Sequence, residues 1–226
     1  NPARSHRSSP LPVTGDDKGP ILGAVRTTLL LLAVTVFAAC ADPACNSSET
    51  AQGPTPEELR DFLELPFTDQ EGQSMRLCDL AGQAVLLSYV YTSCPIQTMC
   101  PLTTKKMAQI QAALPEELEG QVALVSITLD PERDPPEALK GYGEFYGADF
   151  ASWSFLTAGE DAIRASASCC NVTYSFEDNG MIGHNMNLVI LAPDGQIAHE
   201  YPGIDWKVPS VIATLRKLLA ASPRQS

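Results

Sequence analysis

Short, continuous apolar runs alternate with stretches of helical periodicity along the central part of the chain. Residues 84–91 (AVLLSYVY) and 122–129 (VALVSITL) are two such runs, and the pattern is typical of strands covered on both faces of a sheet. Residues 102–114 lie between them and repeat apolar positions at helix spacing. Two buried strands separated by a helix predict a parallel βαβ crossover.

The segments on either side extend this unit. Residues 62–80 contain short apolar stretches around the turn signal at 69–72 (DQEG), which predicts a β-hairpin. Asp134 and Glu137 have the spacing of a capping box, and Pro135 suits the first helical position. A helix is therefore expected to follow, as far as about residue 146.

The C-terminal part completes the pattern. It predicts a strand at 153–156, a helix at 160–168, strands at 187–191 and 196–201, and a final helix at 209–219. The turn Pro193-Asp194-Gly195 joins the last two strands as a hairpin. The expected fold class is α/β: a thioredoxin-like fold with a central mixed sheet flanked by helices and an N-terminal hairpin.

An uncharged apolar run precedes this domain. Residues 27–39 (TTLLLLAVTVFAA) follow Arg26 and are shorter than the roughly 20 residues of a membrane-spanning helix. The run ends at Cys40 in a sequence that resembles a bacterial lipoprotein processing site, which predicts lipidation of Cys40. An uncleaved anchor and ordinary cleavage are the alternatives. All three predict an exported domain on the periplasmic or outer face of the cell membrane.

The chain therefore divides into a leader at 1–40, a polar, flexible tether at 41–57 and a thioredoxin-like domain at 58–226. The formal net charge of the whole chain is −12. A nucleic-acid binder needs a basic face that displaces phosphate counterions, so the acidic balance argues against a nucleic-acid partner.

The strongest chemical signal is the thiol pair Cys94 and Cys100. The pair lies where a buried strand gives way to a helix, and a helix N-terminus stabilises a thiolate. The five-residue gap allows either a disulfide or a two-thiolate metal site. The alternative interpretation is a structural disulfide that closes a loop.

Other cysteines and histidines are less informative. Cys78, Cys169 and Cys170 are expected to be small buried side chains, and a bridge from Cys78 to one of the other two stays open. His184 precedes a predicted strand and is expected in a loop, whereas His199 lies within a strand and is expected at the surface.

Five segments together resemble the SCO proteins, the SCO1/SenC family of copper chaperones for cytochrome c oxidase assembly. The segments are VLLSYVYTSCP, CPLTTKKM, SITLDPERDPPEALKGYG, WSFLTAG and GHNMNLVILAPDG. The resemblance implies a thioredoxin-like fold and one copper ion, Cu(I) or Cu(II), held by Cys94, Cys100 and His184. The family usually has three residues between its cysteines, whereas this chain has five, Pro95 to Met99.

Three functions are compatible with these residues. The first is a metallochaperone that carries copper to an exported apo copper protein, most naturally an oxidase subunit. The second is a thiol–disulfide reductase that uses Cys94 and Cys100 as a redox pair to keep partner cysteines reduced for metallation. The third is a redox sensor. A thiol reductase that recycles the pair is a further expected partner.

Overall fold

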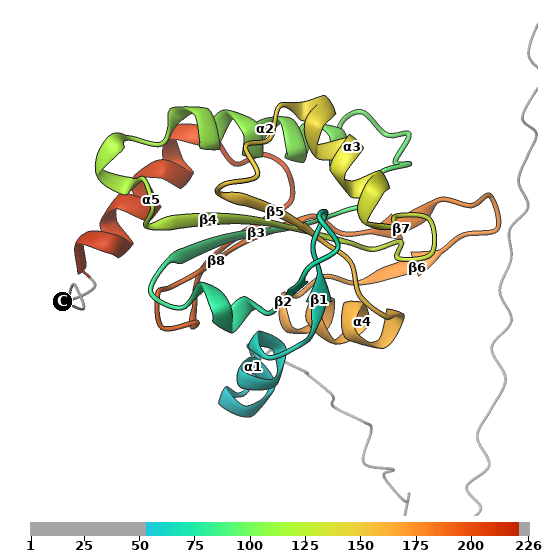
Figure 1. Cartoon of the computed structure of the whole chain (residues 1–226), viewed down its shortest axis with the longest axis horizontal. Coiled ribbons are helices and arrows are strands. Elements are labelled where there is room, and N and C mark those ends of the chain that lie inside the picture. Colours follow the sequence, from blue (N-terminus) through green and yellow to red (C-terminus); the bar gives the residue numbers. More distant parts are fainter. Residues whose placement is uncertain (1–52, 222–226) are drawn as a thin grey trace, which may run out of the picture. The chain divides into compact units, whose positions relative to one another are not determined.

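A five-stranded sheet forms the centre of residues 53–221, the part of the chain that this computed structural model describes (Figure 1). Its strand order is β5-β4-β3-β8-β9. The strands are β3 (Ala84–Val90), β4 (Val122–Thr128), β5 (Trp153–Leu156), β8 (Asn187–Leu191) and β9 (Ile197–Pro202). Strands β3, β4 and β5 are parallel, while β8 and β9 run antiparallel to their neighbours. The predicted mixed sheet and βαβ crossover are confirmed.

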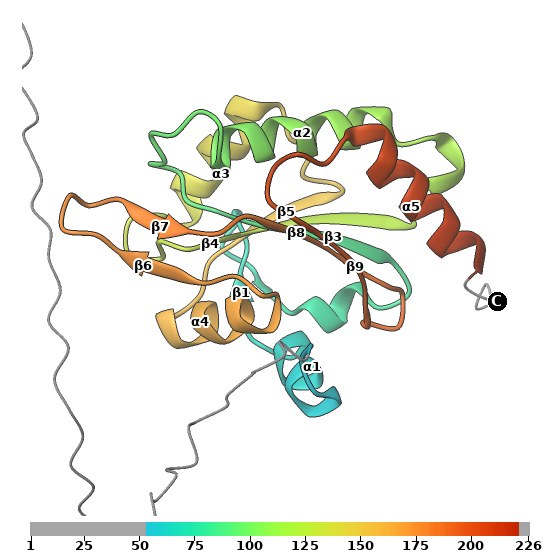
Figure 2. The ribbon, with the colours of Figure 1, turned by 180° about the vertical axis from the view of Figure 1, so that it is seen from behind.

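Helices cover both faces of the sheet (Figures 1 and 2). One face carries α2 (Cys100–Ala113), α3 (Pro136–Tyr146) and α5 (Val208–Ala221), and the other carries α1 (Pro56–Leu63) and α4 (Glu160–Cys169). Successive strand residues point to opposite faces. In β3, Leu86 therefore packs in the α2, α3 and α5 layer, whereas Val85 and Leu87 pack in the α1 and α4 layer. This explains why apolar residues occupy both faces of the central strands β3 and β4.

The start of the domain differs from the prediction. A helix, α1, begins at Pro56, within the segment expected to be tether, and Thr55 caps it in a capping box with Glu58. The expected hairpin at 62–80 is shorter: it consists of β1 (Phe67–Thr68) and β2 (Ser74–Met75), followed by the 3-10 helix η1 (Leu77–Leu80). The capping box at Thr55 explains why the domain begins with a helix, which the apolar pattern alone did not reveal.

Helix α3 also begins differently from the prediction. Its N-cap is Pro135, which has no side-chain capping bond, and its first residue is Pro136. The predicted capping box at Asp134 and Glu137 is therefore wrong. The Asp134 carboxylate instead accepts hydrogen bonds from Thr92 and Thr128, which lie on the loop after β3 and on β4.

A second hairpin was missed by the sequence pattern. Strands β6 (Tyr174–Phe176) and β7 (Ile182–His184) pair antiparallel, with Tyr174 opposite His184. The turn between them uses Gly180 at a φ of +80°, a conformation that favours glycine. Each strand is only three residues long, so periodicity was too weak to indicate it. His184, expected in a loop, ends β7.

The remaining segment between α2 and β4 contains the 3-10 helix η2 (Glu116–Leu118). Within residues 53–221 no helix is both long enough and apolar enough to cross a membrane. The predicted leader at 1–40, Cys40 and the tether as far as residue 52 lie outside the described residues.

Candidate metal and thiol site

The sheet topology brings the site together at one edge. The loops that follow the parallel strands β3 and β4 leave from their carboxyl ends, at the same edge of the sheet. Strand β8 runs antiparallel to β3, so its amino end lies at that edge too. The loop at 91–99, here called the thiol loop, follows β3, and the β6–β7 hairpin precedes β8. The two segments therefore meet, as Figures 1 and 2 show.

One of the two cysteines lies within the thiol loop and the other directly after it. Cys100 is the first residue of α2 and is fully buried, whereas Cys94 lies within the loop and is 8% exposed. Residues 95–98, between them, are exposed. Both cysteines are free thiols in this structure. A helix N-terminus carries unpaired N–H groups and a partial positive charge, so this position favours a thiolate nearby.

His184 contacts the buried cysteine. Its Nε2 lies 3.4 Å from the Cys100 Sγ, and its Nδ1 lies 2.9 Å from the backbone oxygen of Asn185. A carbonyl oxygen only accepts hydrogen bonds, so Nδ1 must carry the proton. Nε2 therefore keeps its lone pair and presents it to the sulfur. Burial lowers the pKa of His184, which favours the neutral imidazole that a metal ligand requires.

The thiol pair is electrostatically unequal. A hydrogen bond from the Cys100 thiol is the main cause that lowers the pKa of Cys94, and it outweighs the effect of burial. The backbone at Ile96 and the Tyr91 hydroxyl act in the same direction. For Cys100, the neighbouring Cys94 sulfur and burial both raise the pKa. Cys94 is therefore the thiol of the pair that ionises more readily.

Tyr91 is a site residue that the sequence analysis missed. It follows β3, is 1% exposed, and its ring meets the His184 ring edge-on at a centroid distance of 5.9 Å. Burial, and then the hydrogen bond with Cys94, raise the pKa of Tyr91 to about 12, so it stays a donor at neutral pH. Its position three residues before Cys94 was the only sequence feature that could have indicated a role in the site. Within an apolar strand, however, a tyrosine is expected to be an ordinary core residue.

The SCO1/SenC family model matches residues 55–220. The chain belongs to the SCO1/SenC family. The SCO1 protein homolog of Bacillus subtilis (strain 168) is 30% identical over 145 residues, which cover 62% of this chain and 74% of the relative. A Stutzerimonas stutzeri protein, named as a candidate copper-binding protein, is 29% identical over 187 residues, which cover 79% of this chain and 87% of the relative.

Solved SCO structures have the same fold. The SCO1/SenC family lipoprotein of Bacillus anthracis str. Ames is 26% identical with a TM-score of 0.63, and the match covers 69% of this chain and 92% of that one. Copper-bound yeast Sco1 is 19% identical with a TM-score of 0.61, and the match covers 71% of this chain and 88% of that one. The predicted thioredoxin-like fold and the family resemblance are confirmed.

The ligands that the SCO1/SenC resemblance implies lie next to each other as two contacting pairs. Cys100 contacts His184, and Cys94 interacts with Cys100. Within residues 53–221, no three His, Cys, Asp or Glu side chains lie close enough together to hold a metal ion. Within the described residues the three side chains are therefore neighbours, but they do not form an assembled three-donor site.

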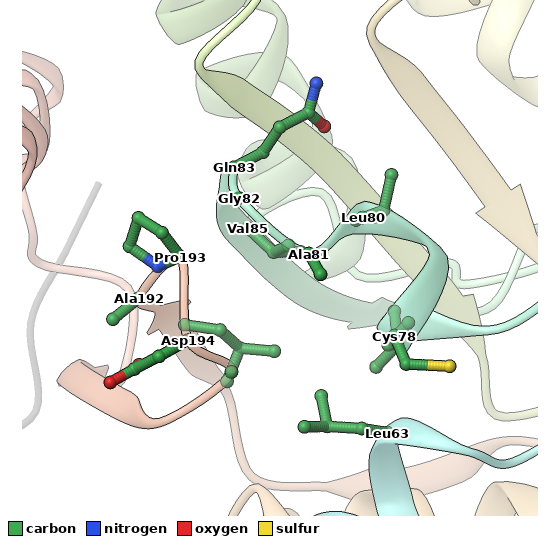
Figure 3. A pocket seen from close by; sticks show the side chains of 13 residues that line it. Leu63, Cys78, Leu80, Ala81, Gly82, Gln83, Val85, Ala192, Pro193 and Asp194 are labelled. Atoms are coloured by element: carbon green, nitrogen blue, oxygen red, sulfur yellow. The ribbon is translucent and has the colours of Figure 1, made fainter. Parts of the chain in front are cut away.

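The other candidate residues lie away from this edge. Cys78 lines a cavity at the start of β3 (Figure 3), whereas the thiol loop follows the other end of that strand. Cys169 and Cys170 are buried at the end of α4, and burial raises the pKa of each thiol. All three are free thiols here, so the bridge from Cys78 that was left open is absent from this structure. His199 is exposed on β9, as predicted.

Proposed function

We propose that this SCO1/SenC protein is a copper metallochaperone that holds one copper ion between Cys94, Cys100 and His184. The observation that carries the proposal is the 3.4 Å approach of the His184 Nε2 to the Cys100 Sγ, with the lone pair of Nε2 directed at the sulfur. The low pKa of Cys94 supplies a second, ready thiolate beside them. These side chains suit metal coordination, because a metal ion binds the deprotonated form of a thiol and the neutral form of an imidazole.

Copper suits these donors better than zinc does. Two soft thiolates and one imidazole favour Cu(I) as a trigonal site, and one weak further ligand accommodates Cu(II). Structural zinc usually takes four strong protein ligands. Copper-binding relatives and copper-bound SCO structures support the same choice of metal.

Copper titration of the reduced protein tests the site. We expect about one equivalent of copper to bind, and Cys94→Ser or Cys100→Ser to abolish tight binding, because each removes one of two thiolates. Cys78→Ser is the matched control, since that thiol lies at the opposite edge of the sheet. Parent-like affinity in a Cys94→Ser, Cys100→Ser double variant would reject this ligand set.

We propose delivery to an exported apo copper site, most naturally the copper centre of a respiratory oxidase. The apolar run at 27–39 before Cys40 supports export and lipid anchoring, and one solved relative is described as a member of a family of cytochrome c oxidase assembly proteins. Mixing the copper-loaded protein with an apo oxidase copper domain should transfer the metal. Mass spectrometry of the protein from membranes should find diacylglycerol on Cys40. Failure of either outcome would remove that part of the proposal.

A thiol–disulfide reductase is the second candidate function, and the low pKa of Cys94 favours it. The substitution His184→Ala separates the two. Disulfide exchange depends on the thiolate fraction, nucleophilicity and access, so it should change only modestly. Copper affinity should fall, and more for Cu(II) than for Cu(I), because the nitrogen donor suits Cu(II). Chelator competition in each oxidation state measures this. Equal Cu(II) affinity in parent and variant would favour the reductase.

A further inference from the structure

One loop reaches both halves of the candidate site. The loop after β4 contains Asp130, Arg133 and Asp134, and both aspartates are almost fully buried. Asp134 accepts a hydrogen bond from the Thr92 backbone, close to Cys94 in the thiol loop, at 3.0 Å. Arg133 extends in the other direction, toward the β6–β7 hairpin that ends in His184.

The Arg133 guanidinium is held in a fixed orientation at its base. Its Nε donates to Asp130 Oδ2 at 2.6 Å, and that carboxylate is only 3% exposed. The backbone of Asp130 also accepts hydrogen bonds from the amides of Arg133 and Asp134, which closes the loop into a tight turn. A planar guanidinium anchored at Nε has its two terminal nitrogens directed away from the anchor. Here they are directed at the hairpin.

Both terminal nitrogens of Arg133 donate to a single carbonyl. Nη1 and Nη2 each lie 3.0 Å from the Gly180 oxygen, at the turn between β6 and β7. Charge-assisted hydrogen bonds are about twice as strong as neutral ones, and a paired donor fixes direction as well as distance. The tip of the hairpin is thereby tied to the loop after β4, which is anchored in the central sheet.

The hairpin needs such a tie. A two-stranded sheet of this size is at best marginally stable alone. At its base, Asn185 accepts from the Thr173 amide at 2.7 Å and donates to the Asn171 oxygen at 2.8 Å. With the base fixed by Asn185 and the tip fixed by Arg133, the imidazole of His184 has a fixed position and direction.

We propose that Arg133 is a positioning residue for His184: by clamping the carbonyl of Gly180 it holds the β6–β7 hairpin so that the imidazole meets Cys100. This inference rests on the proposed copper site only for its functional consequence. The clamp itself is a property of the metal-free protein. Loss of the clamp leaves both thiols in place and releases the nitrogen donor, so the site keeps Cu(I) better than Cu(II).

The test compares Arg133→Ala and Arg133→Lys with the control Arg216→Ala, which removes an exposed ion pair between α5 and Glu117 of η2. Lysine keeps the positive charge beside Asp130 but has no planar fork for Gly180. Three measurements are made on each protein: hydrogen exchange of the 174–184 amides, nuclear Overhauser contacts between the His184 and Tyr91 rings, and Cu(II) spectra with chelator competition.

We expect Arg133→Ala to speed exchange in the hairpin about tenfold or more, the factor that loss of a charged hydrogen bond produces, with the sheet amides unchanged. The ring contact should weaken, the nitrogen hyperfine coupling of Cu(II) should be lost, and Cu(II) affinity should fall about tenfold. Arg133→Lys should recover these properties only in part, and Arg216→Ala should match the parent.

Parent-like exchange and ring contacts in Arg133→Ala would overturn the clamp. Faster exchange throughout the domain would also overturn it, because Arg133 would then support the whole fold. A loosened hairpin with unchanged nitrogen coupling would overturn the positioning role. If the parent itself binds no copper, the proposed function fails, while the exchange and ring measurements on the metal-free protein still decide the clamp.

Discussion

At the scale of single residues, Cys94 and Cys100 carry the same thiol but have different surroundings. Cys100 is fully buried, and its interaction with the Cys94 sulfur is the main cause that lowers the pKa of Cys94, whereas Cys94 lies on the loop, where the Tyr91 hydroxyl acts in the same direction. The result lowers the pKa of Cys94 to about 5 and raises the pKa of Cys100. The pair thus divides into one thiol that ionises readily and one that stays protonated, which suits attack on a disulfide as well as metal capture.

The pH profile of alkylation tests this division. The rate at Cys94, followed residue by residue with iodoacetamide and mass spectrometry, should be flat near pH 7 and fall through about pH 5, where the thiolate becomes protonated. In Cys100→Ala the main stabilising donor is gone, so the midpoint should move up toward the ordinary cysteine value of about 8.5. Cys78→Ala should leave the midpoint unchanged. A midpoint near 8.5 in the parent would contradict the assignment.

At the scale of elements, the short loop after β4 connects the two segments that carry the candidate ligands. Asp134 is fully buried and accepts hydrogen bonds from the thiol loop and from β4, while Arg133 holds the β6–β7 hairpin. The segment that carries Cys94 and the hairpin that carries His184 are therefore both hydrogen-bonded to the same turn. This arrangement explains how two segments far apart in the chain come to lie side by side at the site.

Removal of the Asp134 carboxylate should destabilise the domain. Asp134→Ala leaves the Thr92 amide and the buried Thr128 hydroxyl without their acceptor, and each buried unsatisfied group costs about 1–3 kcal/mol. We expect the free energy of unfolding to fall by about 3 kcal/mol in urea denaturation. Glu132→Ala, an exposed neighbour, should change it by no more than about 0.5 kcal/mol. Equal stability of the two variants would show that Asp134 holds nothing.

At the scale of the whole molecule, the candidate site lies at one end of the sheet, away from most of the apolar core. Parallel strands β3, β4 and β5, buried on both faces, supply a rigid platform, and the site occupies only the edge where β3 and β4 end and β8 begins. Apolar packing on the α2, α3 and α5 side runs along the length of the strands. Stability and copper chemistry should therefore respond to different substitutions.

Leu86→Ala tests that separation. Leu86 is fully buried in the centre of β3, so its truncation should lower the free energy of unfolding by about 2–5 kcal/mol. Phe145→Ala removes a larger side chain that is 81% exposed, and it should cost no more than about 0.5 kcal/mol. Thermal and denaturant unfolding give these values. Copper affinity, measured below the unfolding transition, should match the parent in both; a large loss in Leu86→Ala would contradict the separation.

Several features of this protein follow from the sequence by itself. The predominantly apolar runs at 84–91 and 122–129 have apolar residues on both faces of a strand, and this pattern predicts parallel central strands with helices on either side. The cysteines lie between such a strand and a helix, so their place at the end of the sheet also follows. These are local signals, because period and composition over a few residues carry them.

The tertiary structure alone decided the rest. The strands of the β6–β7 hairpin are too short for periodicity to indicate, and Asp134 has the spacing of a cap but serves as an acceptor for Thr92 and Thr128. The contact between Cys100 and His184 joins residues 84 positions apart, and it exists because β8 runs antiparallel to β3. Strand order and direction are set by the packing of the whole core, which no local segment contains.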